Sequence, residues 1–537
     1  MAHLDYLSNR IGPRLTSSDG LTTACEWTRE KFESLGLANS HLEKWAEWPV
    51  GFNRGPWSGR MVTPEPWALE FATDAWTAGT KGKQRGPAII APTNDEELAA
   101  NKDKLKGAWL LTGSAGGRQG GGGGCGRRGA GERGDGQPAN TSANDGQRTE
   151  AQTADSARGG REQDPQVPEQ PAQPQPTEGQ PAAAERAAAQ PEAQPTQGQP
   201  AEGQAAEGQA ANEQPGRGRR GGNRGAGRRG FNDPFRQRLQ TAAREAGALG
   251  MITRRDAELI VSTGRRPTSM DFFDNLPTIP QITMTASSYD AIANNVREGK
   301  EVMLEFDIRN YFKKGPIPLY NVVADIPGSE HPDECVIVCG HLDSWDAGTG
   351  TTDNGTGCAT TIEAARILMT AGVRPKRTIR FILWSGEEQG ILGSRAYVEA
   401  NSELMKKVSG VLNHDVGTQY ISSIKTLPYQ RSDMEQIFAP VMKLNAEFPF
   451  RLEPVDSLVG LGSDHASFNR VGVPGFIWGQ SGELATYRDT HHTQLDTYDR
   501  AVPAYQEHSS IVVALAAYGI ANLDHMLARA GDDETED

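Results

Sequence analysis

The chain has 537 residues, a formal net charge of −14 and a hydrophobic content of only 36%. Its length suggests two to four domains, and it lacks an apolar run near the roughly 18–20 residues that a membrane-spanning helix needs. The acidic balance argues against nucleic-acid binding as the main role. The first six residues have neither the charged nor the apolar region of a signal peptide and are typical of a helix interior.

The first half of the chain predicts a small α/β domain with a long insert. Apolar spacing and turn residues predict helices at 20–37, 233–248 and 287–298, and strands at 88–91, 108–112, 251–253, 259–261, 302–311 and 319–326. Between 117 and 230 the sole aliphatic residue larger than Ala is Val167, so we predict a disordered insert over 115–232, in the loop between a strand and a helix.

The charge of the insert is balanced, with 14 Arg against 14 Asp plus Glu over 117–230. Its ends are rich in Arg and Gly, a composition that can hold nucleic acid, but no aromatic residue is interleaved for base stacking. A solvated, flexible loop is the favoured interpretation; the alternative is that the ends contact nucleic acid or another anionic partner.

From residue 333 onward strands and helices alternate, which predicts a mostly parallel mixed sheet flanked by helices, an α/β fold. The predicted strands cover 335–339, 378–384, 408–412 and 474–478, and the predicted helices cover 356–369, 391–399, 434–444 and 504–528. Cys335 and Cys339 lie four apart on one strand, too far apart for a disulfide.

Metal-ligand residue types follow each of these strands, at the sheet edge where ligands bind in open α/β folds. The set comprises His341 and Asp343, Asp353, Glu387 and Glu388, Asp415, and His491 and His492. Several carboxylates in one pocket would repel each other, and metal cations remove that cost. Mixed His and carboxylate ligands suit zinc, with manganese or cobalt as substitutes, and the ligand count fits two ions.

Individual roles can be argued from position. Asp353, at the start of a helix, could bridge two ions through its two oxygens. Asp343 can accept the second imidazole N–H of His341, and an unligated carboxylate beside a ligand can act as general base. We interpret His414 as structural, because a strand residue adjacent to Asp415 points to the opposite face.

For three further residues we expect a structural role or leave the role open. Asp464 and His465 are either partners of metal ligands or a plain helix cap, and Asp496 is interpreted as shaping the loop that holds His492.

The strings GHLDSWDAGTGTTDNGTG, WSGEEQG, NHDVG, GSDHASF and HHTQLDTYD, in this order, resemble the two-zinc aminopeptidase family, metallopeptidase family twenty-eight, and within it the plasma-type glutamate carboxypeptidases. The opening RIGPRLTSS and EKFESLGL runs are also similar to that family. The resemblance implies a zinc-exopeptidase domain built from 1–50 and 313–537, with a protease-associated-like domain at 51–312 inserted between them. It also implies that family members are exported, to the outside or the periplasm, although this chain shows no signal.

The resemblance implies a role for each site residue. His341 and Asp415 would bind one zinc, Glu388 and His492 the other, and Asp353 would bridge the two ions. Glu387 would be the general base, Asp343 would support His341, and His491 would lie near the developing oxyanion.

We therefore expect a two-zinc exopeptidase that hydrolyses peptide bonds near the end of short peptides. The alternatives are a single-zinc glutaminyl cyclase-like acyltransferase, a catalytically silent receptor on the same scaffold, and an RG-rich nucleic-acid binder with a passenger domain. A homodimer is also compatible with the sequence.

Overall fold

The computed structural model describes residues 1–114, 234–255, 257–260, 262–264, 266–269, 271–417, 419–458, 462–483 and 487–530. The predicted insert, 115–232, lies outside the described residues. None of the helices within these ranges is both long and apolar enough to cross a bilayer.

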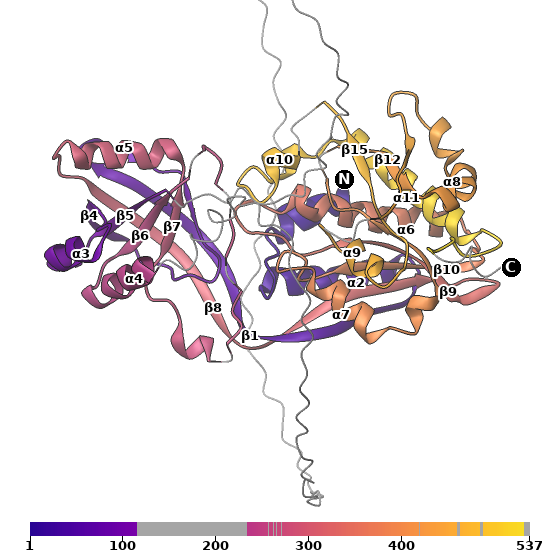
Figure 1. The fold of residues 1–537 in the computed structure, drawn as a ribbon, viewed down its shortest axis with the longest axis horizontal. Helices are drawn as coiled ribbons and strands as arrows, with labels where there is room; N and C mark the ends of the chain where they lie inside the picture. Colours follow the sequence, from indigo (N-terminus) through magenta and orange to yellow (C-terminus); the bar gives the residue numbers. More distant parts are fainter. Residues whose placement is uncertain are drawn as a thin grey trace, which may run out of the picture. The chain divides into compact units, whose positions relative to one another are not determined.

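The described residues form helices and strands in the alternation that the sequence predicts (Figure 1). The helices are α1 (Ala2–Asp5), α2 (Asp19–Ser34), α3 (Asp95–Asn101), α4 (Pro234–Ala246), α5 (Ala286–Arg297), α6 (Thr356–Thr370), α7 (Leu392–Ala400), α8 (Arg431–Phe438), α9 (His465–Asn469), α10 (Tyr487–Thr490) and α11 (Pro503–Ala521). The strands are β1 (Ala38–Thr63), β2 (Trp67–Ala68), β3 (Phe71–Thr73), β4 (Gln84–Ile90), β5 (Trp109–Ser114), β6 (Gly250–Arg254), β7 (Gln281–Met284), β8 (Met303–Ile326), β9 (His331–His341), β10 (Arg377–Trp384), β11 (Val408–Asn413), β12 (Tyr420–Thr426), β13 (Arg451–Pro454), β14 (Gly475–Ile477) and β15 (Gly479–Ser481).

The main sheet has the strand order β14-β11-β9-β10-β8-β4-β5-β6-β7-β3. The strands β14, β11, β9 and β10 are parallel, as are β4 to β7, and the antiparallel strand β8 joins the two groups. Strand β1 pairs with β8 along almost its whole length (Figure 1). This mixed, mostly parallel sheet confirms the predicted α/β fold class.

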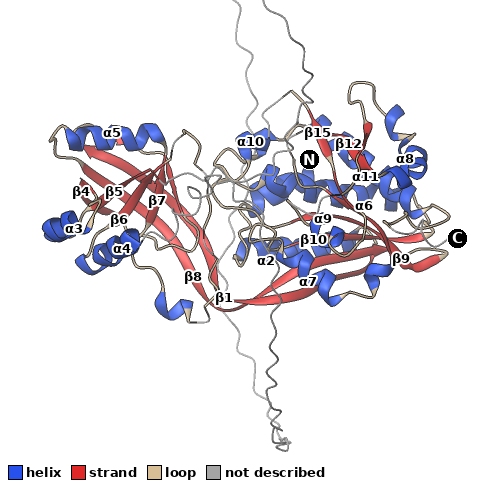
Figure 2. Ribbon diagram, in the orientation of Figure 1, coloured by secondary structure: helices blue, strands red, loops and turns tan. Residues whose placement is uncertain are grey.

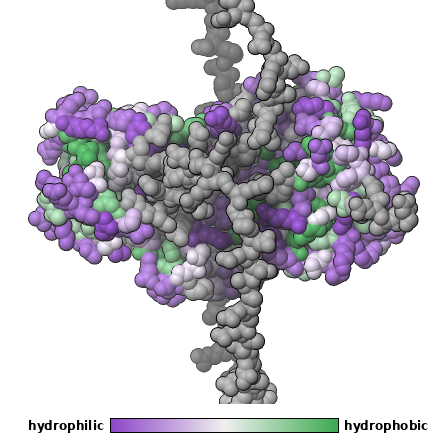
Figure 3. All heavy atoms as spheres, viewed as in Figure 1, coloured by the Kyte–Doolittle hydropathy of each residue, from purple (hydrophilic) through white to green (hydrophobic). Residues whose placement is uncertain are grey.

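Helices cover both faces of the β9–β11 region (Figure 2). Alternate residues of β9 point to opposite faces: Val336 and Val338 pack in a core with α2, α6 and α11, whereas Ile337 and Cys339 pack with α7 and α9. The strands around β5 have their own cores, beneath α5 on one face and α4 on the other. The coloured surface seen in Figure 3 is mainly hydrophilic, with smaller apolar areas between.

Four secondary-structure predictions are wrong, one of them the helix expected at 504–528, which ends at Ala521. The two strands expected at 302–311 and 319–326 are one strand, β8, because β1 supplies hydrogen-bond partners across the polar stretch between them. The strand expected at 259–261 does not form at Leu259 or Ile260, and Val261 lies outside the described residues. The helix expected at 434–444 ends at Phe438, shortly before Pro440, which cannot continue a helix.

The described cysteines Cys25, Cys335, Cys339 and Cys358 are free and buried. This agrees with the expectation that Cys335 and Cys339 form no disulfide. The predicted boundaries at residues 50 and 312 stay predictions, since β1 and β8 run through both without a break.

Candidate metal centre

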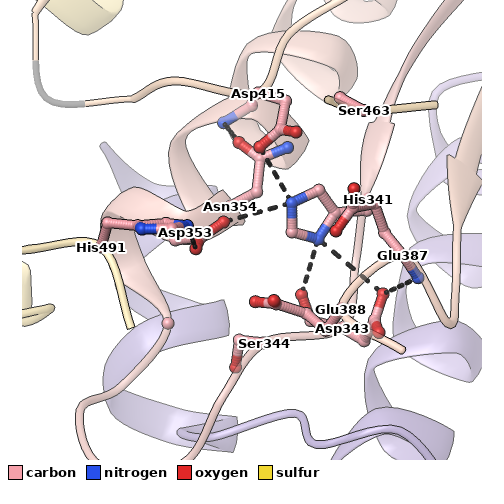
Figure 4. Close-up of polar contacts among 12 residues, drawn as sticks. His341, Asp343, Ser344, Asp353, Asn354, Glu387, Glu388, Asp415, Ser463 and His491 are labelled. Atoms are coloured by element: carbon pink, nitrogen blue, oxygen red, sulfur yellow. Dashed lines mark hydrogen bonds and ion pairs between the residues drawn. The ribbon is translucent and has the colours of Figure 1, made fainter. Parts of the chain in front are cut away.

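His341, the last residue of β9, lies at the centre of the site (Figure 4). Its Nε2 atom is 2.9 Å from Asp415 Oδ1 and 3.2 Å from Asp353 Oδ1. Its Nδ1 atom is 2.9 Å from the backbone oxygen of Asp343, while the Asp343 carboxylate is 3.8 Å away. The backbone carbonyl, rather than the predicted carboxylate, is therefore placed to fix the tautomer that leaves Nε2 free to bind a metal.

Asp353 lies between two histidines. Its Oδ1 faces His341, and its Oδ2 is 3.2 Å from Nε2 of His492 and 3.7 Å from Nε2 of His491. Asp353 has extended rather than helical backbone angles and precedes α6, whose N-cap residue is Gly355. The carboxylate thus does not cap the helix and presents one oxygen to each side.

Glu388 completes the second side of the site. Its Oε2 atom is 2.9 Å from Nε2 of His492, the second residue after the short helix α10. Two groups of side chains have ligand atoms within 4.8 Å of one another and could hold a metal ion: His341 with Asp353 and Asp415, and Asp353 with His491 and His492.

The donor atoms have the properties expected of a metal site. Oδ2 of Asp353 and Oε1 of Glu388 are buried and lack a hydrogen-bond partner among the described residues. Burial and the neighbouring Asp353 raise the pKa of Glu388 to about 7. Burial alone would lower the pKa of His492, but Glu388 and Asp353 raise it to about 11. A cation would replace these protons and use the orphaned oxygens, so the residues present fit one or two zinc ions.

Asp343 and Glu387 lie beside His341 in the site (Figure 4). The Asp343 carboxylate accepts hydrogen bonds from the backbone N–H of Glu387 at 3.2 Å and from the hydroxyl of Thr16 at 2.7 Å. Burial, followed by the negative charges of Asp415 and Asp464, raises the pKa of Glu387 well above its usual value. A carboxyl group with a raised pKa is a candidate general acid and base.

Asp496 accepts hydrogen bonds from the backbone segment that carries Asp353. Its carboxylate accepts hydrogen bonds from the backbone N–H groups of Thr352 and Asp353, the latter at 3.3 Å, and from the Thr352 hydroxyl at 2.9 Å. Asp496 therefore holds the strand-to-helix connection that carries Asp353. This is a wider role than the predicted shaping of the His492 loop.

His414, His465 and Asp464, which lie outside the proposed ligand set, are buried. Burial lowers the pKa of both His414 and His465 to about 4, so these rings stay neutral. The His414 backbone oxygen accepts a 2.6 Å hydrogen bond from the side chain of Asn354, beside Asp353. Asp464 makes no side-chain cap bond to α9, and burial raises its pKa to about 7. The plain-cap interpretation of Asp464 therefore does not hold.

Sequence reasoning missed the residues that support the site from far along the chain. The buried Arg14 donates to the carbonyl of Leu342 beside Asp343, and Thr16 contacts Asp343 itself. Both belong to the RIGPRLTSS string, which was the available signal.

Comparisons with known proteins show a family match over part of the chain. Residues 321–516 match the model of peptidase family M28. Carboxypeptidase Q of Mus musculus is 32% identical over 265 residues, 48% of this chain and 53% of that protein, and carboxypeptidase Q of Xenopus laevis is 29% identical over 313 residues, 56% and 64%. The chain thus matches between half and two thirds of the length of these relatives.

A solved structure shares the fold over nearly the whole chain. The crystal structure of a peptidase M28 precursor from Shewanella amazonensis is 21% identical, with a TM-score of 0.55, covering 98% of this chain and 94% of that one. The family match spans β9, β10 and β11 together with His341, Asp353, Glu388, Asp415 and His492. Residues 321–516, which contain the candidate metal centre, therefore resemble peptidase family M28.

Proposed function

We propose that the protein is a zinc-dependent exopeptidase that cleaves short peptides near one terminus. The observation that carries the proposal is the shared carboxylate of Asp353, which lies 3.2 Å from His341 on one side and 3.2 Å from His492 on the other. His341 and Asp415 would hold one zinc ion, and Glu388 and His492 the other. Manganese or cobalt ligate similarly and could substitute.

When bound, two zinc ions polarise the scissile carbonyl and make a water molecule acidic enough to attack it. The chain supplies the proton transfer: the Glu387 carboxylate accepts the proton of the attacking water and gives it to the leaving amine. The Asp343 carboxylate holds Glu387 in place by accepting a hydrogen bond from the Glu387 backbone N–H. Burial, together with the nearby charges of Asp415 and Asp464, raises the pKa of Glu387, which makes its carboxylate a stronger proton acceptor.

The first experiment is a zinc count with a panel of dipeptides and aminoacyl substrates. We expect two ions per chain, and hydrolysis that a chelator abolishes and zinc restores. Glu387→Gln should keep both ions and lose about 10²–10⁴-fold in turnover, whereas Asp353→Asn should lose ions. Glu363→Gln, on the outer side of α6, is the control and should change neither. Full hydrolysis by Glu387→Gln, or by the chelated protein, would contradict the proposal.

The same zinc count separates the alternatives. A single ion with cyclisation of peptides that begin with glutamine would indicate a glutaminyl cyclase-like acyltransferase. Two ions without hydrolysis of any substrate would indicate a binding protein. We also propose export to the periplasm or the outside, on the family resemblance alone, and cell fractionation tests it.

A further inference from the structure

Ile260 and Ser262 pair with the loop that carries His492. The backbone N–H of Ser262 donates to the His492 carbonyl at 2.9 Å, and the N–H of Gln494 donates to the Ile260 carbonyl at 3.2 Å. The side-chain oxygen of Gln494 accepts the N–H of Ile260 at 2.8 Å. Ile260 and Ser262 thus hold this loop, although they lie about 230 positions earlier in the chain. They also lie outside the M28 match, which begins at residue 321.

The backbone of His492 needs such support. Its φ is +59°, in the left-handed region that residues other than glycine rarely adopt. In this conformation the ring reaches Glu388 at 2.9 Å and Asp353 at 3.2 Å. The bond from Ser262 is made to the carbonyl of this residue, so it acts at the point where the backbone is strained.

A buried ion pair anchors Ser262. The Ser262 hydroxyl donates to Asp346 Oδ1 at 2.7 Å. Asp346 also receives two contacts of 2.9 Å from Arg54, through Nη2 to Oδ1 and through Nε to Oδ2, and both side chains are at most 4% exposed. Arg54 lies in β1 and donates further to the carbonyl of Thr73 at 2.8 Å. The anchor therefore belongs to the rigid sheet rather than to a surface loop.

Asp346 is also tied to the other side of the site. It follows His341 and Asp343 by a few residues, and the ring of its neighbour Trp345 packs edge-on against the His492 ring at 5.9 Å. The same connection thus contacts His492 through Trp345 and supports it through Ser262.

We propose that Ser262 and Asp346 are positioning residues that hold His492 for the second metal ion, the one shared with Glu388. The proposal rests on the proposed two-zinc function. It makes the two ions unequal: the ion held by His341 and Asp415 does not depend on this anchor, whereas the ion held by Glu388 and His492 does. Loss of the Ser262–Asp346 bond would weaken one affinity only.

The test measures zinc affinity by competition with a chromophoric chelator, using the full chain, with no need for activity. Ser262→Ala removes one hydroxyl and leaves the Arg54–Asp346 pair intact, so it should fold. We expect a 10–100-fold weaker affinity for one of two zinc ions and an unchanged affinity for the other. Asp346→Asn should weaken the same ion, and the double variant should be no weaker than Asp346→Asn alone, because the two residues act in one chain of contacts.

Asp290→Asn is the matched control. It removes the carboxylate from another bidentate Arg–Asp pair, the one that joins Arg254 in β6 to Asp290 in α5, and should leave both affinities unchanged. Equal loss of both ions in Ser262→Ala, or no loss of either, would overturn the positioning role while two ions in the unaltered chain uphold the proposed function. An unaltered chain that binds no zinc would overturn both.

Discussion

Arg14 provides a stringent test of how the site is held. Its side chain is fully buried, and burial lowers its pKa, but a guanidinium stays charged in proteins. The guanidinium donates hydrogen bonds to five backbone carbonyls, those of Leu7, Gly12, Leu342, Thr349 and Gly350. These bonds tie the N-terminal segment to both ends of the connection between His341 and Asp353.

The cost of removing this side chain can be worked out from the contacts. The bonds to the carbonyls of Leu342 and Gly350 are buried and short, 2.7 and 2.6 Å. At about 1.5–3 kcal/mol for a hydrogen bond to a charged group, they contribute about 3–6 kcal/mol. With an unfolding entropy of about 2.1 cal/mol/K per residue over about 420 residues outside the insert, Arg14→Met should therefore lower the melting temperature of the metal-free protein by roughly 3–7 °C. Arg14→Lys keeps the charge but loses the forked geometry of the guanidinium, so its melting temperature should lie between those of the unaltered chain and Arg14→Met.

Arg29→Met is the control, because Arg29 has two carboxylate contacts, to Glu30 and Glu33, yet lies on the surface. Exposed ion pairs contribute less than about 1 kcal/mol, so this variant should melt within about 2 °C of the unaltered chain. Calorimetry or circular dichroism measures all three. If Arg14→Met melts as high as Arg29→Met, the buried carbonyl contacts do not stabilise the fold and the reasoning is wrong.

Three further predictions concern the site and the insert. Between pH 6.5 and 8 the metal-free folded chain holds more protons than the unfolded chain, because the pKa of Glu388 is raised from 4.5 to about 7 and that of His492 from 6.5 to about 11. The free energy of unfolding should therefore fall as pH rises, by up to about 1.4 kcal/mol per pH unit for each proton. Melting curves recorded with a chelator at several pH values check this. Replacing Gly by Ala normally stabilises a helix, but at Gly357 the added Cβ would lie 2.4 Å from both the His414 carbonyl and the Asn354 side chain. Gly357→Ala should therefore lower the free energy of unfolding by about 1–3 kcal/mol and weaken zinc binding. An unchanged melting temperature would contradict this. Replacing 117–230 with a few Gly and Ser residues should leave the melting temperature unchanged, because β5 and α4 need only a short connection, and a drop of several degrees would show that the insert stabilises the fold.

The sequence predicts the α/β half of the fold well because its strands are short, apolar and bounded by turns. It misses β1, a strand of 26 residues, for a physical reason. The pairing of β1 with β8 shifts register between Lys44 and Ala46, between Trp48 and Val50, and again further on. Each irregularity breaks the two-residue alternation by which a strand is recognised.

In the candidate site, too, some residues could be predicted from the sequence and others could not. The proposed ligands could be found because each follows an element of the sheet, so one pattern places them together. The Arg54, Asp346 and Ser262 contacts could not be found, because they join positions 292 and 84 residues apart that share no pattern. Polar support of this kind depends on the tertiary fold, and a single sequence does not record it.

The acidic charge also has to be reinterpreted. The insert is neutral, so the formal charge of −14 belongs to the remaining chain. Some of these carboxyl groups are partly protonated in the metal-free protein at pH 7, since burial raises the pKa of Glu388, Asp464 and Asp496 to about 7. Burial also raises the pKa of Glu387 well above its usual value. The site thus stores protons where the proposed zinc ions would bind. Zinc binding must release them, so zinc affinity should rise with pH over the range in which the metal-free protein loses stability.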